Sequence, residues 1–290
     1  MVTVITRRRK GKTEYYLKYS SIGKSKEKYL GTTKPQNIDK IKLEFEEQSY
    51  REDKIPLLET IRKNYSKRNM TINPKILQAE YHGFKINHTY STQKIEGSTM
   101  TLMQTRKLLE DKMSPKDTAV EDIIEAQQMA ILFEDMVKTD RDISKRLILD
   151  WHTKLFERTD SNNAGSFRRE DVGSYLGKTE YVLWSEVVSE IEDLVRWYKE
   201  NSHMNPVEMA ARFHFKFEMI HPFIDGNGRI GRLLMIFILH KNGYPMMNIE
   251  PKEKQTYINK LESSYLRANS MIFVKWMISK YLKANKKFTK

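Results

Sequence analysis

Apolar side chains recur at helical spacing from about residue 38 to the end of the chain, and this pattern limits the folds open to it. The segment 144–157 is typical, with apolar residues Leu147, Ile148, Trp151, Leu155 and Phe156. A stripe of this kind on each of several helices has to be buried against other helices. The pattern therefore predicts a mainly α-helical bundle of about 250 residues and argues against a central parallel sheet.

Breaks in this pattern predict where individual helices begin and end. We expect a helix over 38–69, interrupted at Pro56, and a second over 75–96, stopped by Gly97. Thr118-Ala119-Val120-Glu121 reads as a capping box that opens a helix running to about 138. Further helices are expected over 144–157, from about 185, over 206–220 after an N-cap at Asn205, from 228 or 229 to 242, over 252–267 and over 270–284. Residues 160–183 are rich in Gly and Asn and predict a loop that carries a hairpin.

The first 34 residues differ from the rest and predict a small β-rich appendage. The segments 3–8, 15–19 and 28–30 are β-prone, and turns are expected at Gly11 and at 20–23. A boundary is placed near residue 35, where Gly31-Thr32-Thr33-Lys34-Pro35 breaks the pattern. The expected domains are the appendage, 1–34, a set of N-terminal helices, 35–100, and a core, 101–290.

The positive charge of the chain is concentrated in the same appendage. The net charge is +13, and residues 1–34 hold ten Lys/Arg against two acidic residues, a balance of +8. Tyrosines at 15, 16, 19 and 29 are interleaved with these cations. Residues 1–34 could therefore bind nucleic acid through phosphate contacts and stacking. The alternative is a solvated small sheet or an edge that docks a partner protein.

Composition excludes several classes of site. The chain has no cysteine, so it has no disulfide framework, no thiolate zinc site and no cysteine nucleophile. Its longest apolar run, Leu233 to Leu239, is far shorter than a membrane span. No apolar stretch follows the early basic cluster, so a secretory signal is not expected. We expect a cytoplasmic protein without membrane contact.

One stretch of twelve residues carries most of the chemical information: His221-Pro222-Phe223-Ile224-Asp225-Gly226-Asn227-Gly228-Arg229-Ile230-Gly231-Arg232. The two glycines at 226 and 228 permit positive φ and predict a tight loop before a new helix. Backbone N–H groups of such a loop, at a helix N-terminus, form an anion site. Arg229 and Arg232 are three residues apart and share a helix face. Two guanidiniums beside an anion site suit a polyphosphate.

The same stretch supplies a base and a metal ligand. His221 ends the preceding helix, because Pro222 disfavours helical backbone at the residue before it. The imidazole would lie across the loop, where it could take a proton from an incoming hydroxyl. Asp225 offers hard oxygen ligands at the mouth of the loop, which suit Mg²⁺ bound to phosphates. Nucleotide, metal and base together indicate transfer chemistry at phosphorus with an external nucleophile.

These residues resemble the signature of the Fic family, His-x-Phe-x-Asp/Glu-Gly-Asn-Gly-Arg-x-x-Arg, at every defined position. The resemblance extends over roughly 70–285. It implies a Fic-fold helical bundle with a β-hairpin flap at about 172–183, where Tyr175 and the run 180–183 are candidates for the edge that aligns a target by strand addition. It also implies transfer of AMP from ATP to a Ser, Thr or Tyr hydroxyl of a protein, with Mg²⁺. The related Doc kinases typically have Lys at the position of Gly228, so Gly228 favours the AMP-transferring branch.

The resemblance assigns a role to each residue of the signature. His221 would be the general base, Asp225 the Mg²⁺ ligand and Phe223 a structural anchor. The residues that would bind the ATP phosphates are Gly226, Asn227, Gly228, Arg229 and Arg232. Tyr257 and Leu261 resemble the Tyr-x-x-x-Leu helix that closes the adenine pocket, and Ser264 replaces an Asn found in some relatives. His214 is expected to be a packed core residue.

A second match, Thr92-Gln93-Lys94-Ile95-Glu96-Gly97, resembles the inhibitory helix of Fic proteins, Ser/Thr-x-x-x-Glu-Gly/Asn. Glu96 would form an ion pair with Arg232 and occupy the arginine that grips the outer phosphate. We therefore expect an autoinhibited protein adenylyltransferase that modifies target proteins, including itself. The alternatives are a nucleic-acid-tethered regulator that uses the Fic core as a switch, or an enzyme that mainly removes AMP or uses another nucleotide. A homodimer is also left open.

Overall fold

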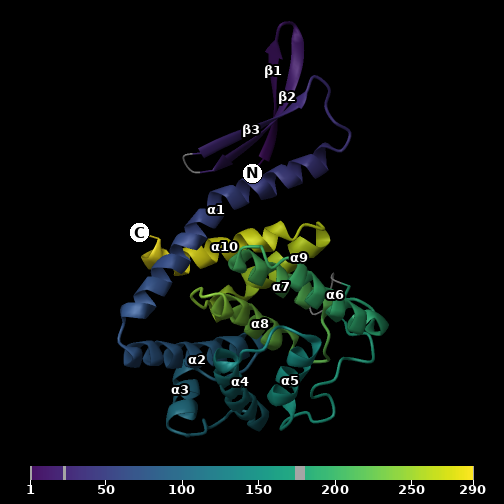
Figure 1. The fold of residues 1–290 in the computed structure, drawn as a ribbon. Coiled ribbons are helices and arrows are strands. Elements are labelled where there is room, and N and C mark those ends of the chain that lie inside the picture. Colours follow the sequence, from purple (N-terminus) through teal and green to yellow (C-terminus); the bar gives the residue numbers. More distant parts are fainter. Residues whose placement is uncertain (1, 22–23, 174–179, 290) are drawn as a thin grey trace. The chain divides into compact units, whose positions relative to one another are not determined.

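The computed structural model describes residues 2–21, 24–173 and 180–289, which form two compact units, 1–60 and 61–290 (Figure 1). The first unit holds three strands and the first part of a long helix, and the second unit is helical. The mainly α-helical fold with a small N-terminal sheet is confirmed.

The first unit is an antiparallel sheet in the order β1-β2-β3, formed by β1 (Val2–Arg9), β2 (Lys12–Ser21) and β3 (Lys24–Gly31). Val2, Leu17 and Tyr19 are buried on one face of the sheet, where Phe45 of helix α1 (Ile38–Thr71) packs against them. Because of this contact, the compact unit extends beyond residue 35, near which a boundary was expected. The turn expected at 20–23 lies partly outside the described residues.

Helix α1 runs through Pro56, where the sequence predicted an interruption. A proline in a helix removes one backbone N–H donor and crowds the preceding turn, which bends a helix more often than it ends one. The helix also gains a bond here, because the Thr60 hydroxyl donates to the Pro56 carbonyl at 2.9 Å. The interruption predicted at Pro56 was therefore wrong.

The helices of the second unit that follow α1 are α2 (Pro74–Glu96), α3 (Leu102–Glu110), α4 (Val120–Lys138), α5 (Lys145–Phe156), α6 (Val187–Glu200), α7 (Pro206–Ile220), α8 (Asn227–Lys241), α9 (Lys254–Leu266) and α10 (Met271–Ala284). Three short 3₁₀ turns, Trp184–Glu186, Pro251–Glu253 and Lys286–Phe288, accompany them. Helix α3, whose capping box joins Thr101 and Gln104, was not predicted from the sequence. The capping box predicted at Thr118 was wrong, because the N-cap of α4 is Ala119 and no side chain bonds to the helix end.

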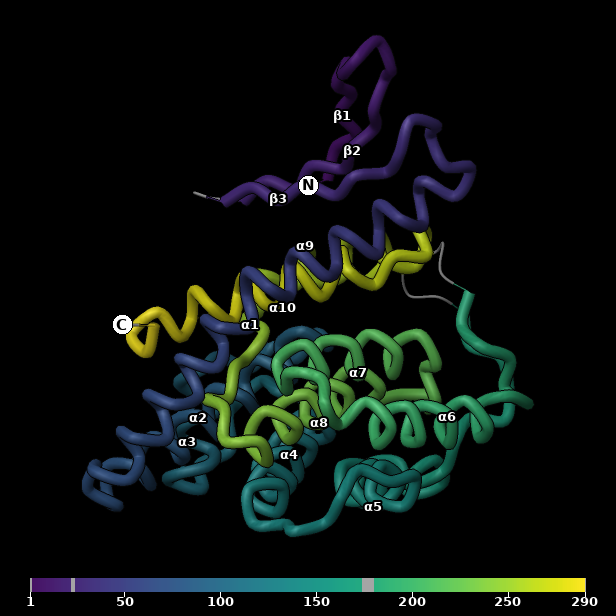
Figure 2. The backbone as a smooth tube through the Cα atoms, turned by 45° about the horizontal axis from the view of Figure 1, so that its top comes forward, coloured from purple at the N-terminus to yellow at the C-terminus, as the bar shows by residue number. Residues whose placement is uncertain are grey.

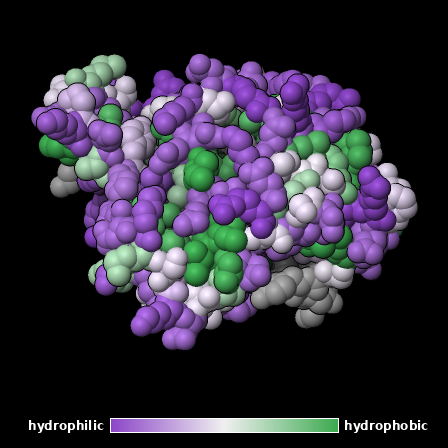
Figure 3. Space-filling view, turned by 90° about the horizontal axis from the view of Figure 1, so that it is seen from below, coloured by the Kyte–Doolittle hydropathy of each residue, from purple (hydrophilic) through white to green (hydrophobic). Residues whose placement is uncertain are grey.

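Helix α8 is the centre of the second unit. Every residue from Leu233 to Leu239 is at most 1% exposed, so the helix is apolar all round and has neighbours on all sides. It packs against α7, α2, α4 and α5 (Figure 2). Because α8 begins directly after the signature loop, the core of the bundle holds that loop in place. The surface drawn in Figure 3 is mostly hydrophilic, and apolar side chains occupy small areas of it.

The segment 160–183 contains no strand among its described residues. The centre of the predicted hairpin, including Tyr175, lies outside the described residues. Tyr181-Val182-Leu183, which was predicted to be β-prone, is irregular and leads into the 3₁₀ turn at Trp184. Within the described part of the chain, no helix is long and apolar enough to cross a membrane.

Candidate active site

The signature loop joins α7 to α8 and is held by its own residues. His221 is the C-cap of α7, with left-handed backbone at φ 50° and its N–H bonded to the Phe217 carbonyl. Phe223 is fully buried. The Asn227 side chain closes the loop, since its Oδ1 accepts from the Phe223 N–H and its Nδ2 donates to the Phe223 carbonyl, both at 2.8 Å. With both ends of this amide engaged, Asn227 can offer its backbone N–H to a ligand.

The two glycines of the loop serve different needs. Gly226 is the N-cap of α8 with φ 82°, and a Cβ there would lie 2.4 Å from the Phe156 ring. Gly228 lies within α8 with ordinary helical backbone, so it does not use the positive φ that a glycine permits. A Cβ on Gly228 would instead lie 2.4 Å from Glu96 Oε1 and 2.7 Å from Arg232 Nη1. Both atoms are the ends of flexible side chains, so a side chain at 228 would displace the Glu96–Arg232 contact and leave the backbone in place.

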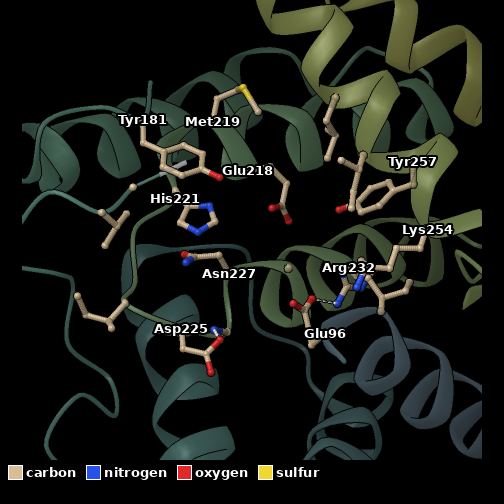
Figure 4. Close-up of a pocket in the computed structure, with 18 residues that line it drawn as sticks. Glu96, Tyr181, Glu218, Met219, His221, Asp225, Asn227, Arg232, Lys254 and Tyr257 are labelled. Atoms are coloured by element: carbon tan, nitrogen blue, oxygen red, sulfur yellow. Dashed lines mark hydrogen bonds and ion pairs between the residues drawn. The ribbon is translucent and has the colours of Figure 1, made fainter. Parts of the chain in front are cut away.

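His221 is half-buried and its imidazole is neutral. Burial lowers the pKa of its imidazole to about 4, so the ring is uncharged at neutral pH. The ring stacks on Tyr181, with centroids 4.0 Å apart and planes 12° apart (Figure 4). Its Nδ1 atom is buried without a hydrogen-bond partner among the described residues. One of the two nitrogens of a neutral imidazole carries no proton and can accept one.

Arg168 anchors the end of α7. It was not identified from the sequence. Its side chain is fully buried, and its Nε donates to the His221 carbonyl at 2.8 Å. Further bonds run to the carbonyls of Glu170, Val182 and Ile220. The Arg168 backbone N–H also donates to the Pro222 carbonyl at 2.9 Å. One guanidinium therefore ties the backbone at Glu170 and at Val182 to the backbone of His221.

Arg229 lies behind the loop, among acidic side chains. Its Nη2 is 2.7 Å from Asp225 Oδ2, and its Nη1 pairs with Glu125 of α4. The guanidinium also lies over the Phe156 ring, 4.7 Å from the centroid. Arg229 is not among the residues that line the cavity in front of the loop. These contacts hold the loop against α4 and α5, and phosphate binding by Arg229 stays a prediction.

A histidine of α5 supports the loop from the other side. His152 accepts at Nδ1 from the Gly165 N–H, 3.0 Å away, so its Nε2 is the donor to the Asp225 carbonyl, also 3.0 Å away. Its ring stacks on Phe223, with centroids 3.7 Å apart. Burial lowers the pKa of His152 to about 4. Backbone groups of two loops thus fix one tautomer of a neutral ring.

The ion pair predicted from the sequence is present. Arg232 Nη2 lies 2.5 Å from Glu96 Oε1, and 136 residues separate the pair along the chain (Figure 4). Thr92 holds the same guanidinium, because its hydroxyl accepts from Arg232 Nε at 3.0 Å and its carbonyl accepts from Nη2 at 3.3 Å. Gly97 ends α2 in the left-handed conformation, with φ 115°. Helix α2 therefore presents Thr92 and Glu96, one turn apart, to one arginine.

A cavity of about 320 Å³ opens between these elements. It is lined by residues of α2, α7, the loop, α8 and α9, among them Glu96, Glu218, His221, Asp225, Gly226, Asn227, Gly228, Arg232 and Tyr257. The Tyr257 hydroxyl is 2.8 Å from His214 Nε2, and His214 is fully buried, as expected of a core residue. Glu218 points into the cavity, and burial raises its pKa to about 8, so it is protonated at neutral pH (Figure 4).

The cavity suits Mg²⁺ only in partnership with a ligand. Asp225 is 63% exposed and presents carboxylate oxygens, which Mg²⁺ prefers. No group of three or more metal-ligating side chains occurs among the described residues. One or two carboxylates completed by substrate phosphates is a common magnesium arrangement, so the residues fit an ion brought in with a nucleotide.

Four contributors were not identified from the sequence as site residues: Glu125, His152, Arg168 and Glu218. Glu125 and His152 carried a weak signal, since each is a polar residue near the apolar face of an amphipathic helix. Arg168 carried none, because its partners are backbone carbonyls from distant segments. Glu218 lies within α7 and reads as an ordinary helical residue until the cavity is seen.

Comparison with known proteins gives the same picture. Residues 142–239 match the model of the Fic/DOC family. "Protein adenylyltransferase Fic" of Drosophila ananassae is 34% identical over 180 residues, covering 60% of this chain and 36% of that protein. "Protein adenylyltransferase fic-1" of Caenorhabditis briggsae is 33% identical over 186 residues, covering 62% and 36%. The chain thus spans about a third of the length of these curated relatives.

Solved structures share the fold over most of the chain. A Fic domain containing signaling protein from Bacteroides thetaiotaomicron superposes with a TM-score of 0.70 at 26% identity, covering 80% of this chain and 96% of that one. Fic-1 from C. elegans gives a TM-score of 0.74 at 23% identity, covering 88% and 77%. The family match therefore shows a Fic domain over residues 142–239, and the solved structures share the fold of the chain around it.

Proposed function

We propose that this protein transfers AMP from ATP to a hydroxyl side chain of a target protein. The observation that carries the proposal is a neutral His221 in the same cavity as the N-terminus of α8 and Arg232. The first N–H groups of a helix have no partner within it and favour anions. The curated relatives, named protein adenylyltransferases, support the same reaction.

In this reaction His221 accepts the proton of the target hydroxyl. The oxygen then attacks the α-phosphorus of ATP, a new P–O bond forms, and the bond to pyrophosphate breaks. The N–H groups of Gly226, Asn227 and Gly228 would hold the phosphates, and Arg232 would hold the outer one. Tyr257, on the cavity wall, would contact the adenine. Asp225 would hold Mg²⁺, which neutralises phosphate charge when bound.

The ion pair between Glu96 and Arg232 would act as a brake on this reaction. The Arg232 side chain is 3% exposed and the Glu96 side chain is 36% exposed, so the pair closes the inner wall of the cavity. While Arg232 is held by Glu96 and Thr92, it cannot also grip an outer phosphate. ATP would then enter with its phosphates displaced from the line of attack, and position is a large part of such catalysis.

Transfer of label from α-³²P-ATP to protein tests the base. His221→Ala should abolish transfer while ATP binding and the melting temperature stay near those of the wild type, because the ring acts on the nucleophile. Asp225→Ala should instead weaken Mg²⁺-dependent ATP binding. A His221→Ala protein that labels targets at the wild-type rate would remove the base assignment.

The brake is tested by removing its carboxylate. Glu96→Gly should raise self-labelling strongly, since Arg232 becomes free for the outer phosphate. The same substitution in a His221→Ala background should leave the protein inactive, and Arg232→Ala alone should be inactive as well. If Glu96→Gly leaves labelling unchanged with ATP, UTP and CTP alike, the brake is rejected. Faster loss of label from a pre-modified target in the wild type than in Glu96→Gly would indicate AMP removal as the main activity.

A further inference from the structure

We propose that the β1–β2 ribbon of the first unit binds double-stranded DNA in the major groove, a function separate from the transfer reaction. The ribbon is the segment 7–14, which includes the turn at Lys10 and Gly11. The pairing of β3 with β2 ends at Tyr15 and Gly31, so this segment forms two strands beyond the edge of the third (Figure 1). All residues from Arg7 to Thr13 are exposed.

The ribbon is built to be stiff. Arg9 pairs with Lys12 across a two-residue turn, and both turn residues have positive φ, 47° at Lys10 and 78° at Gly11. Turns of this kind match the right-handed twist of the strands they join. At the base of the ribbon, Leu17 is fully buried against α1. A stiff ribbon loses little conformational entropy when it binds.

The charge of the ribbon is strong and mostly unpaired. Five of its eight residues are cations, namely Arg7, Arg8, Arg9, Lys10 and Lys12, and one, Glu14, is acidic. Arg7 pairs with Glu27 at 2.8 Å, and Glu14 accepts from the Tyr16 hydroxyl. The other four cations have no ion-pair partner within the described part of the chain. They are therefore available to phosphates without breaking an internal contact.

The positions of these cations on the ribbon indicate which polyanion it binds. Side chains alternate between the faces of a strand, so Arg8 lies on the face of Val2 and Leu17, whereas Arg9 and Lys12 lie on the opposite face. Cations on both faces and at the tip fit a groove with a phosphate row on each side. The major groove of B-DNA is about 12 Å wide and admits a two-stranded ribbon. The major groove of duplex RNA is too narrow for side chains to read.

A membrane surface suits the ribbon less well. Residues 7–14 read Arg-Arg-Arg-Lys-Gly-Lys-Thr-Glu and contain no apolar side chain that could enter the headgroup region. Cations on two opposite faces also cannot all meet one flat anionic surface. Duplex DNA is the polyanion that can contact both faces of the ribbon together.

Fluorescence anisotropy with a labelled 24-base-pair DNA duplex of mixed sequence tests the proposal. The full chain should bind, and the logarithm of affinity should fall with the logarithm of KCl concentration with a slope of about −3 to −4, as four phosphate contacts require. Arg8→Gln/Arg9→Gln/Lys10→Gln/Lys12→Gln should weaken binding by more than about tenfold and flatten this slope. The matched control is Lys283→Gln/Lys286→Gln/Lys287→Gln/Lys290→Gln, which removes the same charge from the other end of the chain.

Several outcomes would overturn the proposal. These are no duplex binding at 50 mM KCl, equal losses in the two quadruple variants, or equal or tighter binding to a single strand, to duplex RNA or to polyglutamate. Unchanged melting temperatures in both variants would show that folding does not account for a loss. The titrations are made without ATP and repeated with His221→Ala, so a failure of the transfer reaction cannot be mistaken for a failure of DNA binding.

Discussion

Arg168 is a buried side chain that acts on His221 through the backbone carbonyl of that residue and not through the imidazole ring. Its guanidinium donates to the backbone carbonyls of His221, Glu170 and Val182. Burial lowers the pKa of Arg168, and the hydrogen bonds that its guanidinium donates to several carbonyls offset the loss of hydration. Arg168 is therefore a positioning residue for the left-handed backbone at His221, whose φ is 50°.

Replacing Arg168 by Lys tests this role. Lysine keeps the charge and loses the planar fork, so it cannot reach all of these carbonyls together. We expect kcat for transfer to fall by about tenfold or more while the KM for ATP changes little, because a misplaced base affects the chemical step. Arg169→Lys is the matched control, since Arg169 is the exposed neighbour. An equal rise in KM with unchanged kcat would assign Arg168 to nucleotide binding instead.

At the residue scale, the sequence identified groups that are expected to act on a ligand and missed those that hold them in place. The signature at 221–232 and the Glu96 match could be recognised because residue types recur at fixed local spacing. Asn227 was placed on the phosphates, yet its amide bonds to the Phe223 backbone on both sides. His152 and Arg168 bond mainly to backbone groups of other segments, and such partners leave no mark on local residue spacing.

At the scale of elements, helix ends were predictable where a single residue ends or caps the helix by itself. Gly97 ends α2 with positive φ, and Asn205 caps α7 because its side chain accepts a hydrogen bond from the Val207 N–H. Pro56 misled because its fixed φ also fits a helix interior. The capping motif at Thr118 was misleading, because neighbouring residues compete for the N-cap position. The helix starts one residue later than the motif predicts.

Helix α2 works as a unit in the proposed brake, and Thr92→Val tests its second contact. Valine keeps the shape of threonine and removes the acceptor for Arg232 Nε. A bond to a charged group contributes about 1–3 kcal/mol, so stability should fall by that order and self-labelling should rise up to about tenfold. The rise should stay below that of Glu96→Gly, because the carboxylate remains.

Helix α2 also supplies the control for this experiment. The Thr89 hydroxyl lies one turn earlier and is buried without a hydrogen-bond partner among the described residues. Thr89→Val should therefore leave labelling unchanged and stability unchanged or slightly higher. If the two valine variants raise labelling equally, the effect comes from general loosening of α2 and not from Arg232.

At the scale of the whole molecule, the helical core is held by packing around α8 and contains several uncharged histidines. Burial lowers the pKa of His88, His152 and His221 to about 4 and that of His214 to about 3. In an unfolded chain these rings would titrate near 6.5. Their contribution to stability is therefore present above pH 6.5 and is lost as the pH falls toward 4, because the unfolded chain binds protons that the folded protein does not.

Glu218 acts in the opposite direction over part of this range. Its folded pKa of about 8 lies above its unfolded value of 4.5, so the folded protein holds one extra proton between these values. For these five groups alone, four histidines less one glutamate leave a difference of three protons between about pH 4.5 and 6. These groups should then lower the free energy of unfolding by about 4 kcal/mol for each pH unit of acidification. Domains of this kind have a free energy of unfolding of about 5–15 kcal/mol in total, so the helical unit should unfold near pH 5.

Urea titrations at pH 7, 6 and 5.5 measure this slope, and His203→Gln, at an exposed site, should not alter it. A slope below one proton would mean that these rings are protonated in the folded state, and a charged His221 could not act as the base.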